Sequence, residues 1–166
     1  MSFRVGVLTV SDRGARGERV DTAGPAVAAL MAATGAEVSE TAIVADERDR
    51  IATKLRDWAD ESQLDLILTT GGTGLALRDV TPEATAAVAE RTVPGLAEAM
   101  RAAGRKSTPL ADLSRATAVT RGRTLIVNLP GSEKGARESL AAIVDLLPHA
   151  IAVLHDDTEH PRADLT

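Results

Sequence analysis

The chain alternates between short apolar segments that favour strands and longer segments that favour helices. The strand-like segments cover residues 3–10, 37–44 and 64–70, and residues 26–34 and 50–62 between them have helical character. Such alternation is typical of a parallel sheet, because parallel strands need a long crossover, usually a helix, which is almost always right-handed. We therefore expect an α/β fold with three layers, α/β/α, built on a mostly parallel sheet.

A different pattern in the second half of the chain predicts an antiparallel pair. Residues 116–128 contain Thr120-Arg121-Gly122-Arg123 between two β-prone runs, which indicates a hairpin or a bent strand. The chain is long enough for one domain, which we place at residues 1–155, followed by a polar tail at 156–166.

Two helices in the second half have clear start signals. Thr81 and Pro82 predict the N-cap and the first residue of a helix that continues to about Ala89. Ser132 follows a strand-like run and is predicted to cap a helix that continues to about Leu147. A helix start of this kind can bind phosphate.

Composition excludes several classes of function. The absence of cysteine rules out a thiolate nucleophile, a zinc–thiolate site and disulfides. A net charge of −5, with one Phe, one Trp and no Tyr, argues against nucleic-acid binding. No apolar run approaches membrane-spanning length, and the first residues enter a strand without a signal-peptide pattern, so we expect a cytoplasmic protein.

The run Gly71-Gly72-Thr73-Gly74 is the motif most closely tied to chemistry. Glycines let backbone N–H groups approach phosphate oxygens, and Thr73 adds a hydroxyl donor. Asp79 lies five residues beyond the run and would repel a phosphate unless a cation lay between them, which indicates a metal-dependent nucleotide site. The alternative is a tight connection after a buried strand, with no ligand. The run matches neither the P-loop nor the dinucleotide-binding pattern.

Four loops are predicted to meet beyond the carboxyl ends of the strands, where α/β proteins bind ligands. Their contents would suit a nucleotide, a divalent cation and a second anionic group; the loops cover residues 9–12, 45–47, 71–79 and 128–132. Taken singly, Asp12 and Asp46 are better interpreted as helix caps, and Asp79 could bind Arg78 or a local N–H group. Arg78 and Lys134 could contact phosphates or be surface charges.

Together these segments resemble the MogA/MoaB family of molybdenum cofactor biosynthesis over about residues 3–155. The glycine run with the Arg-Asp-Val-Thr-Pro-Glu that follows is the most specific part; the matching segments are Thr9-Val10-Ser11-Asp12, Asp46-Glu47, Thr70-Gly71-Gly72-Thr73-Gly74, Arg78-Asp79-Val80-Thr81-Pro82-Glu83, Val93-Pro94-Gly95 and Asn128-Leu129-Pro130-Gly131-Ser132. Relatives of this family include the G domain of gephyrin.

The resemblance implies the fold of molybdenum cofactor biosynthesis proteins and a molybdopterin adenylyltransferase. Such an enzyme transfers AMP from ATP to the terminal phosphate of molybdopterin, releases pyrophosphate and depends on Mg²⁺. By position in the motifs, Asp46 and Asp79 match the catalytic and metal-associated aspartates. The segments that match substrate-binding loops contain Thr9, Ser11, Asp12, Gly71, Gly72, Thr73, Gly74, Ser114, Pro130, Gly131 and Ser132. The resemblance also implies a homotrimer or hexamer and hand-over of the product to a molybdate-inserting protein.

Two other functions fit the same motifs. One is a non-catalytic molybdopterin-binding or scaffolding domain, and the other is a nucleotide-cofactor pyrophosphatase on the same fold. The sequence also departs from the family at Ala23, where relatives often have Ser, so we expect Thr22 to cap the first helix instead.

Overall fold

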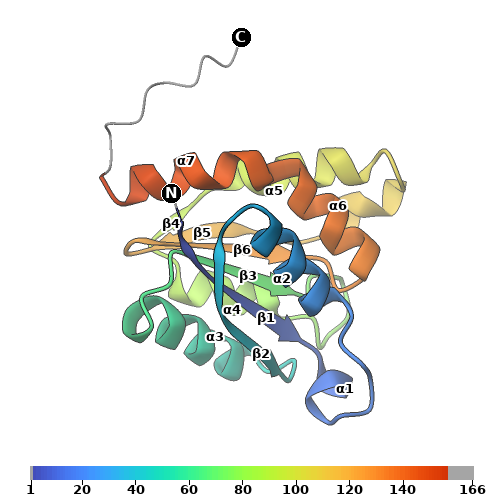
Figure 1. Ribbon diagram of the computed structural model, residues 1–166. Coiled ribbons are helices and arrows are strands. Elements are labelled where there is room, and N and C mark those ends of the chain that lie inside the picture. Colours follow the sequence, from blue (N-terminus) through green and yellow to red (C-terminus); the bar gives the residue numbers. More distant parts are fainter. Residues whose placement is uncertain (1, 157–166) are drawn as a thin grey trace.

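A computed structural model describes residues 2–156, and a six-stranded sheet forms its centre (Figure 1). The strand order is β2-β1-β3-β6-β5-β4. The first four strands in this order are parallel, whereas β5 is antiparallel to both β6 and β4. The strands are β1 (Arg4–Val10), β2 (Glu37–Val44), β3 (Leu66–Thr70), β4 (Arg91–Thr92), β5 (Ala118–Arg121) and β6 (Thr124–Leu129).

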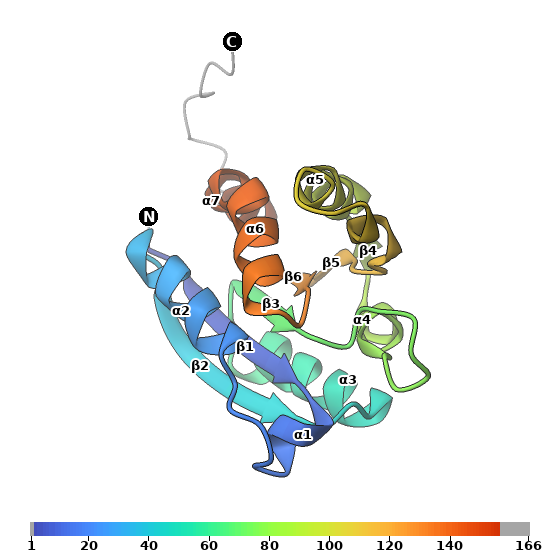
Figure 2. The ribbon, with the colours of Figure 1, turned by 90° about the vertical axis from the view of Figure 1, so that its right-hand side faces the viewer.

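Helices cover both faces of the sheet, so the three-layer prediction is confirmed (Figure 2). The first face packs against α2 (Ala23–Ala33), α5 (Pro94–Gly104), α6 (Glu133–Ile143) and α7 (Leu147–Leu154). The second face packs against α3 (Arg48–Arg56), the π-helical turn η1 (Asp57–Glu61) and α4 (Thr81–Val88). Three short helices complete the order: α1 (Asp12–Ala15), η2 (Pro109–Leu113) and η3 (Val144–Leu146).

Each face has its own apolar core, because strands buried on both sides present alternate side chains to opposite layers. Val5 and Val7 of β1 pack on the α2 side, and Leu8 and Val10 pack on the α3 side. All five residues of β3 are buried. Both aromatic residues, Phe3 and Trp58, lie in these cores.

The predicted strands and the hairpin are confirmed, while some helix boundaries were wrong. The helix predicted over 50–62 begins at Arg48 and changes to the π-helical turn at Asp57. The helix capped by Ser132 ends at Ile143 rather than Leu147. Strand β4 contains only two residues, which is too short for a periodic pattern to reveal.

Thr81 is not the N-cap of α4, because Val80 occupies that position. The Thr81 side chain is fully buried instead, and its hydroxyl donates to the carbonyl oxygen of Gly71 at 2.9 Å. The Thr81 N–H also donates to the Gly72 carbonyl oxygen at 3.1 Å. The start of α4 therefore holds the glycine run in place.

A buried polar network holds the carboxyl end of β6 against its neighbours. The Asn128 amide donates to the hydroxyls of Thr69 and Thr85, each at 3.0 Å, and its carbonyl oxygen accepts the N–H of Thr117 at 3.2 Å. Asn128 is fully buried. It therefore ties β6 to β3 and α4 immediately before the loop at residues 130–132.

Candidate active site

Two cavities open side by side beyond the carboxyl ends of β1, β3 and β6. Their volumes are about 470 and 290 Å³. Both are lined by Gly72, Asp79, Gly131 and Ser132, so these four residues form a shared wall. Strand order reverses here, since β2 lies on one side of β1 and β3 on the other, which is where ligands bind in open α/β sheets.

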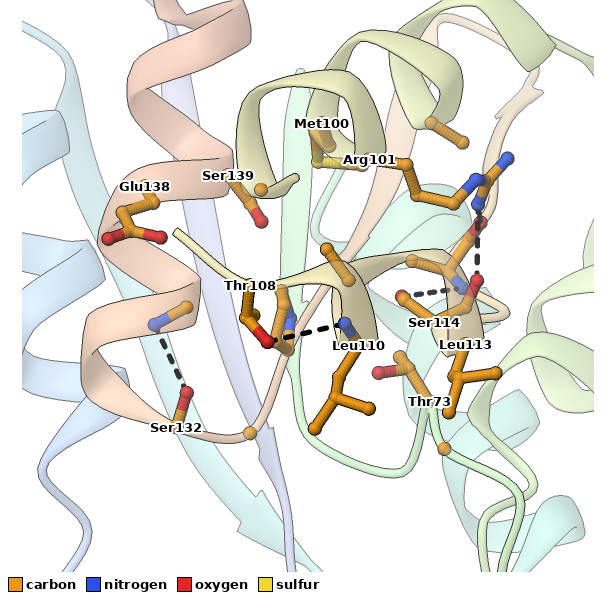
Figure 3. Close-up of a pocket in the computed structure, with 18 of the residues that line it drawn as sticks. Thr73, Met100, Arg101, Thr108, Leu110, Leu113, Ser114, Ser132, Glu138 and Ser139 are labelled. Atoms are coloured by element: carbon orange, nitrogen blue, oxygen red, sulfur yellow. Dashed lines mark hydrogen bonds between the residues drawn. The ribbon is translucent and has the colours of Figure 1, made fainter. Parts of the chain in front are cut away.

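The larger cavity lies between α5, α6 and η2 (Figure 3). Met100 and Arg101 of α5 line it together with Leu110 and Leu113 of η2, and the Arg101 side chain extends toward the backbone beside Ser114. Besides the shared wall, four of the predicted site residues line this cavity: Thr73, Gly74, Ser114 and Pro130. The combination of apolar walls with a few polar groups is typical of a small-molecule site.

The smaller cavity is more polar and lies at the end of β1. It is lined by Thr9, Ser11, Asp46 and Gly71 from the predicted set, together with the shared wall. The structure thus brings the predicted loops together at one edge of the sheet. Asp12 lines neither cavity, and neither do the candidate phosphate ligands Arg78 and Lys134.

The glycine run is required by the packing of this turn. Gly71 and Gly72 have φ angles of +96° and +68°, which residues with a Cβ rarely adopt. A Cβ on Gly71 would lie 2.3 Å from the Val10 carbonyl oxygen, and one on Gly72 would lie 2.2 Å from the Thr81 hydroxyl. The interpretation as a tight connection therefore accounts for both glycines, and phosphate binding by the run stays a prediction.

Asp12 and Asp46 are joined by reciprocal hydrogen bonds. The Asp12 N–H donates to Asp46 Oδ2 at 2.7 Å, and the Asp46 N–H donates to Asp12 Oδ1 at 3.0 Å. Interpreting either residue as a helix cap was wrong: Ser11 caps α1, and Glu47 occupies the N-cap position of α3. The two loops after β1 and β2 are thereby held in a fixed relation.

Arg78 and the carboxylates of Asp12, Asp46 and Asp79 form one group of interacting charges at the smaller cavity, which Arg19 and Asp21 also line. Arg78 forms a bidentate ion pair with Asp12, at 3.0 and 2.8 Å, which lowers the pKa of Asp12 below its usual value. The pKa of Asp46 is raised, first by burial and then by the charges of Asp12 and Asp79. Asp46 therefore lies in a region of negative charge that Arg78 offsets only in part, and such perturbed carboxylates are common at functional sites.

Asp79 lies beside the last glycine of the run, whereas Asp46 lies beside its second glycine. A Cβ on Gly74 would lie 2.8 Å from Asp79 Oδ2, whereas one on Gly72 would lie 3.2 Å from Asp46 Oδ1. Asp79 Oδ2 accepts the N–H of Ala76 at 3.0 Å, which agrees with the prediction of a local backbone partner, whereas Arg78 binds Asp12.

The donor set fits Mg²⁺ held in part by its substrate. Residues 2–156 contain no group of three or more His, Asp or Glu side chains close enough to bind a metal ion by themselves. Mg²⁺ is usually held by one or two carboxylates plus substrate phosphates and waters, and Asp46 and Asp79 could supply the two carboxylates.

Three hydroxyls predicted to bind substrate also make local hydrogen bonds. Ser11 Oγ accepts the Gly14 N–H at 3.0 Å, and Ser132 Oγ accepts the Gly135 N–H at 3.1 Å, so the predicted cap of α6 is confirmed. Ser114 Oγ accepts the N–H of Ala116 at 3.2 Å. Lys134, a candidate phosphate ligand, has its Nζ 3.9 Å from Oε1 of Glu138.

Asp21 is a residue of the site that sequence reasoning missed. Its Oδ2 accepts the Thr9 hydroxyl at 2.6 Å, and its Oδ1 accepts the Gly24 N–H at 3.0 Å. Thr22 occupies the N-cap position of α2, as predicted, but its side chain makes no capping hydrogen bond. Asp followed three residues later by a helical N–H is a capping pattern that could have revealed Asp21.

Sequence reasoning also missed the walls contributed by α5 and η2. Those residues belong to no loop at the carboxyl ends of the strands, which is where α/β proteins bind ligands. They include Ala97, Met100, Arg101, Thr108, Leu110 and Leu113.

The family described as "Probable molybdopterin binding domain" matches residues 6–149. This chain belongs to that family. The molybdopterin adenylyltransferase of Helicobacter pylori strain J99 is 43% identical over 155 residues, which cover 92% of this chain and 88% of that protein. MoaB from Thermus thermophilus superimposes with a TM-score of 0.88 at 57% identity, covering 93% of this chain and 97% of that one.

A further relative is longer. The Drosophila melanogaster protein called molybdenum cofactor synthesis protein cinnamon is 45% identical over 162 residues, which cover 97% of this chain and 27% of that protein. Within residues 2–156 of the chain described here, no helix is both long and apolar enough to cross a membrane.

Proposed function

We propose that this chain is a molybdopterin adenylyltransferase, with residues 1–155 as its molybdopterin-binding domain. One observation carries the proposal: two adjacent cavities share a wall formed by Gly72, Asp79, Gly131 and Ser132, and Asp46 lines the smaller cavity together with Asp79. Two substrates that occupy adjacent cavities would meet with their phosphates at the shared wall. The relatives named molybdopterin adenylyltransferase support the same activity.

In this reaction the terminal phosphate of molybdopterin attacks the α-phosphorus of ATP, and pyrophosphate leaves. The chain needs no general base, because a phosphate monoester has a second pKa of about 6 and is largely ionised at neutral pH. The harder task is to bring two anions together, and positioning and charge neutralisation carry most of the catalysis in such transfers.

The roles of the side chains follow from their places. Asp46 and Asp79 would hold Mg²⁺, which supplies the charge that offsets the phosphates. Ser132, the N-cap of α6, belongs to the shared wall, so the positive end of the helix dipole would favour phosphate there. Thr9, Thr73 and Ser114 line the cavities and would orient the two substrates.

Pure protein incubated with molybdopterin, ATP and Mg²⁺ should release pyrophosphate only when molybdopterin is present. Binding of molybdopterin without turnover would instead support a scaffolding domain. Hydrolysis of a dinucleotide without molybdopterin would support a pyrophosphatase.

We further propose a cytoplasmic homotrimer that passes its product to a molybdate-inserting protein. Light scattering at micromolar concentration should give three times the chain mass of 17.3 kDa. A monomer would contradict the assembly without affecting the proposed activity.

A further inference from the structure

The loop that carries Asp79 has almost no anchoring in the apolar core. Residues 75–78 are all exposed, and the side chains of Leu75 and Leu77 are 66% and 99% exposed. Loops with few buried contacts open at low free-energy cost. The position of Asp79 therefore depends on polar contacts, which are the ion pair of Arg78 with Asp12 and a set of hydrogen bonds at the ends of the loop.

Arg115 supplies hydrogen bonds at both ends of the loop from a different part of the chain. Its Nε donates to the Gly74 carbonyl oxygen at 2.8 Å, and its Nη2 donates to the Asp79 carbonyl oxygen at 2.7 Å. Its backbone N–H donates to the Thr73 carbonyl oxygen at 2.9 Å, and its Nη1 forms an ion pair with Glu83 of α4. One guanidinium thus holds both ends of the loop and the helix that follows it.

Arg115 is itself held in place. The carbonyl oxygens of its two neighbours, Ser114 and Ala116, accept hydrogen bonds from Nη1 of Arg101 at 3.3 and 3.1 Å. Arg101 lies on α5 and lines the larger cavity. The contacts therefore continue from the cavity wall through Arg115 to the loop of Asp79.

We propose that Arg115 is a positioning residue that sets the place of Asp79 at the shared wall. The inference rests on the proposed adenylyl transfer. The planar fork of arginine reaches two carbonyl oxygens and a carboxylate at once, whereas a lysine ammonium is a point charge on a flexible stem. Lysine at position 115 keeps the charge but cannot hold both ends of the loop.

The variant Arg115→Lys tests this role by turnover and by amide exchange in the free protein. We expect kcat to fall about a hundredfold, as for a misplaced catalytic group, with the KM for molybdopterin within about threefold of wild type. The amides of Ala76 and Asp79, which donate within the loop, should exchange faster than in wild type.

Arg121→Ala is the matched control. The Arg121 guanidinium also bonds one carbonyl oxygen, that of Val88, and forms an ion pair with Asp60, but it lies outside both cavities. This variant should keep wild-type kcat and wild-type exchange in the loop. A comparable loss of kcat in Arg121→Ala would mean that Arg115→Lys lowers kcat through a general loss of stability, and it would overturn the inference.

A double variant separates action through Asp79 from other effects. If Arg115 works through Asp79, adding Arg115→Lys to Asp79→Asn should lower kcat by less than about threefold further, since residues acting as a unit are not additive. A full additional loss, or wild-type kcat in Arg115→Lys alone, would overturn the proposal. An inactive but folded wild-type protein would instead refute the adenylyltransferase, while loop exchange would still report on Arg115.

Discussion

Replacing Asp46 with Asn should stabilise the protein at neutral pH while it removes activity. The hydrogen bond from the Asp12 N–H can be kept, because the amide oxygen of Asn accepts in place of Asp46 Oδ2. The substitution removes one of three neighbouring negative charges, which Arg78 only partly offsets. Relieving charge repulsion at a functional site typically raises the free energy of unfolding by about 0.5–2 kcal/mol, or Tm by about 1–8 °C for a chain of this size.

The sign of the pH dependence follows from the raised pKa of Asp46. An acid with a raised pKa in the folded state ionises more easily when unfolded, so it lowers stability as pH rises through that pKa. The advantage of Asp46→Asn should therefore be full above the folded pKa. It should shrink as pH falls toward about 3.9, the value for an unperturbed aspartate.

Urea unfolding between pH 8 and pH 4 measures the difference in free energy of unfolding between Asp46→Asn and wild type. The control variant is Asp145→Asn, because Asp145 on η3 is exposed. Turnover of Asp46→Asn should fall by about two orders of magnitude or more, as when one electrostatic stabiliser of the transition state is lost. A variant less stable than wild type at pH 7.5 would refute the reasoning on charge. Near-wild-type turnover would remove Asp46 from the mechanism.

Three other substitutions test separate parts of the site. Asp79→Asn should also lower Mg²⁺-dependent turnover by about two orders of magnitude and leave molybdopterin affinity largely unchanged, as measured by calorimetry. Gly72→Ala should lower the free energy of unfolding by about 2–4 kcal/mol, because the new Cβ meets buried Thr81 at a positive φ; an unchanged urea midpoint would contradict this. Asn128→Leu should cost about 2–4 kcal/mol, because it leaves buried Thr hydroxyls and the Thr117 N–H without partners; thermal unfolding equal to wild type would contradict it.

The sequence predicts the sheet well because its strands are buried on both faces and therefore strongly apolar. Periodicity locates β1, β2 and β3, and turn residues locate the hairpin of β5 and β6. Prediction from the sequence fails where a side chain has two possible hydrogen-bond partners. Thr81 is a residue type that often caps helices, but tertiary packing directs its hydroxyl to the Gly71 carbonyl oxygen.

The candidate site is predictable only where strands end in loops. Those loops meet as expected, and their glycines lie at two adjacent cavities together with Asp46 and Asp79. Contacts between residues distant in the chain leave no local signal, which is why the Asp12–Asp46 bonds and the Thr9–Asp21 bond were missed. Arg115 reaches Gly74 across 41 positions, and no short motif shows such a contact.

The wall shared by the two cavities affects how the enzyme finishes its cycle. If each substrate occupies one cavity, as proposed, adenylylated molybdopterin would be bound at both cavities at once. Linked ligands gain affinity because the second contact is intramolecular. We therefore expect the product to dissociate more slowly than either substrate and to inhibit further turnover. A downstream protein that takes the product directly from the surface would relieve that inhibition.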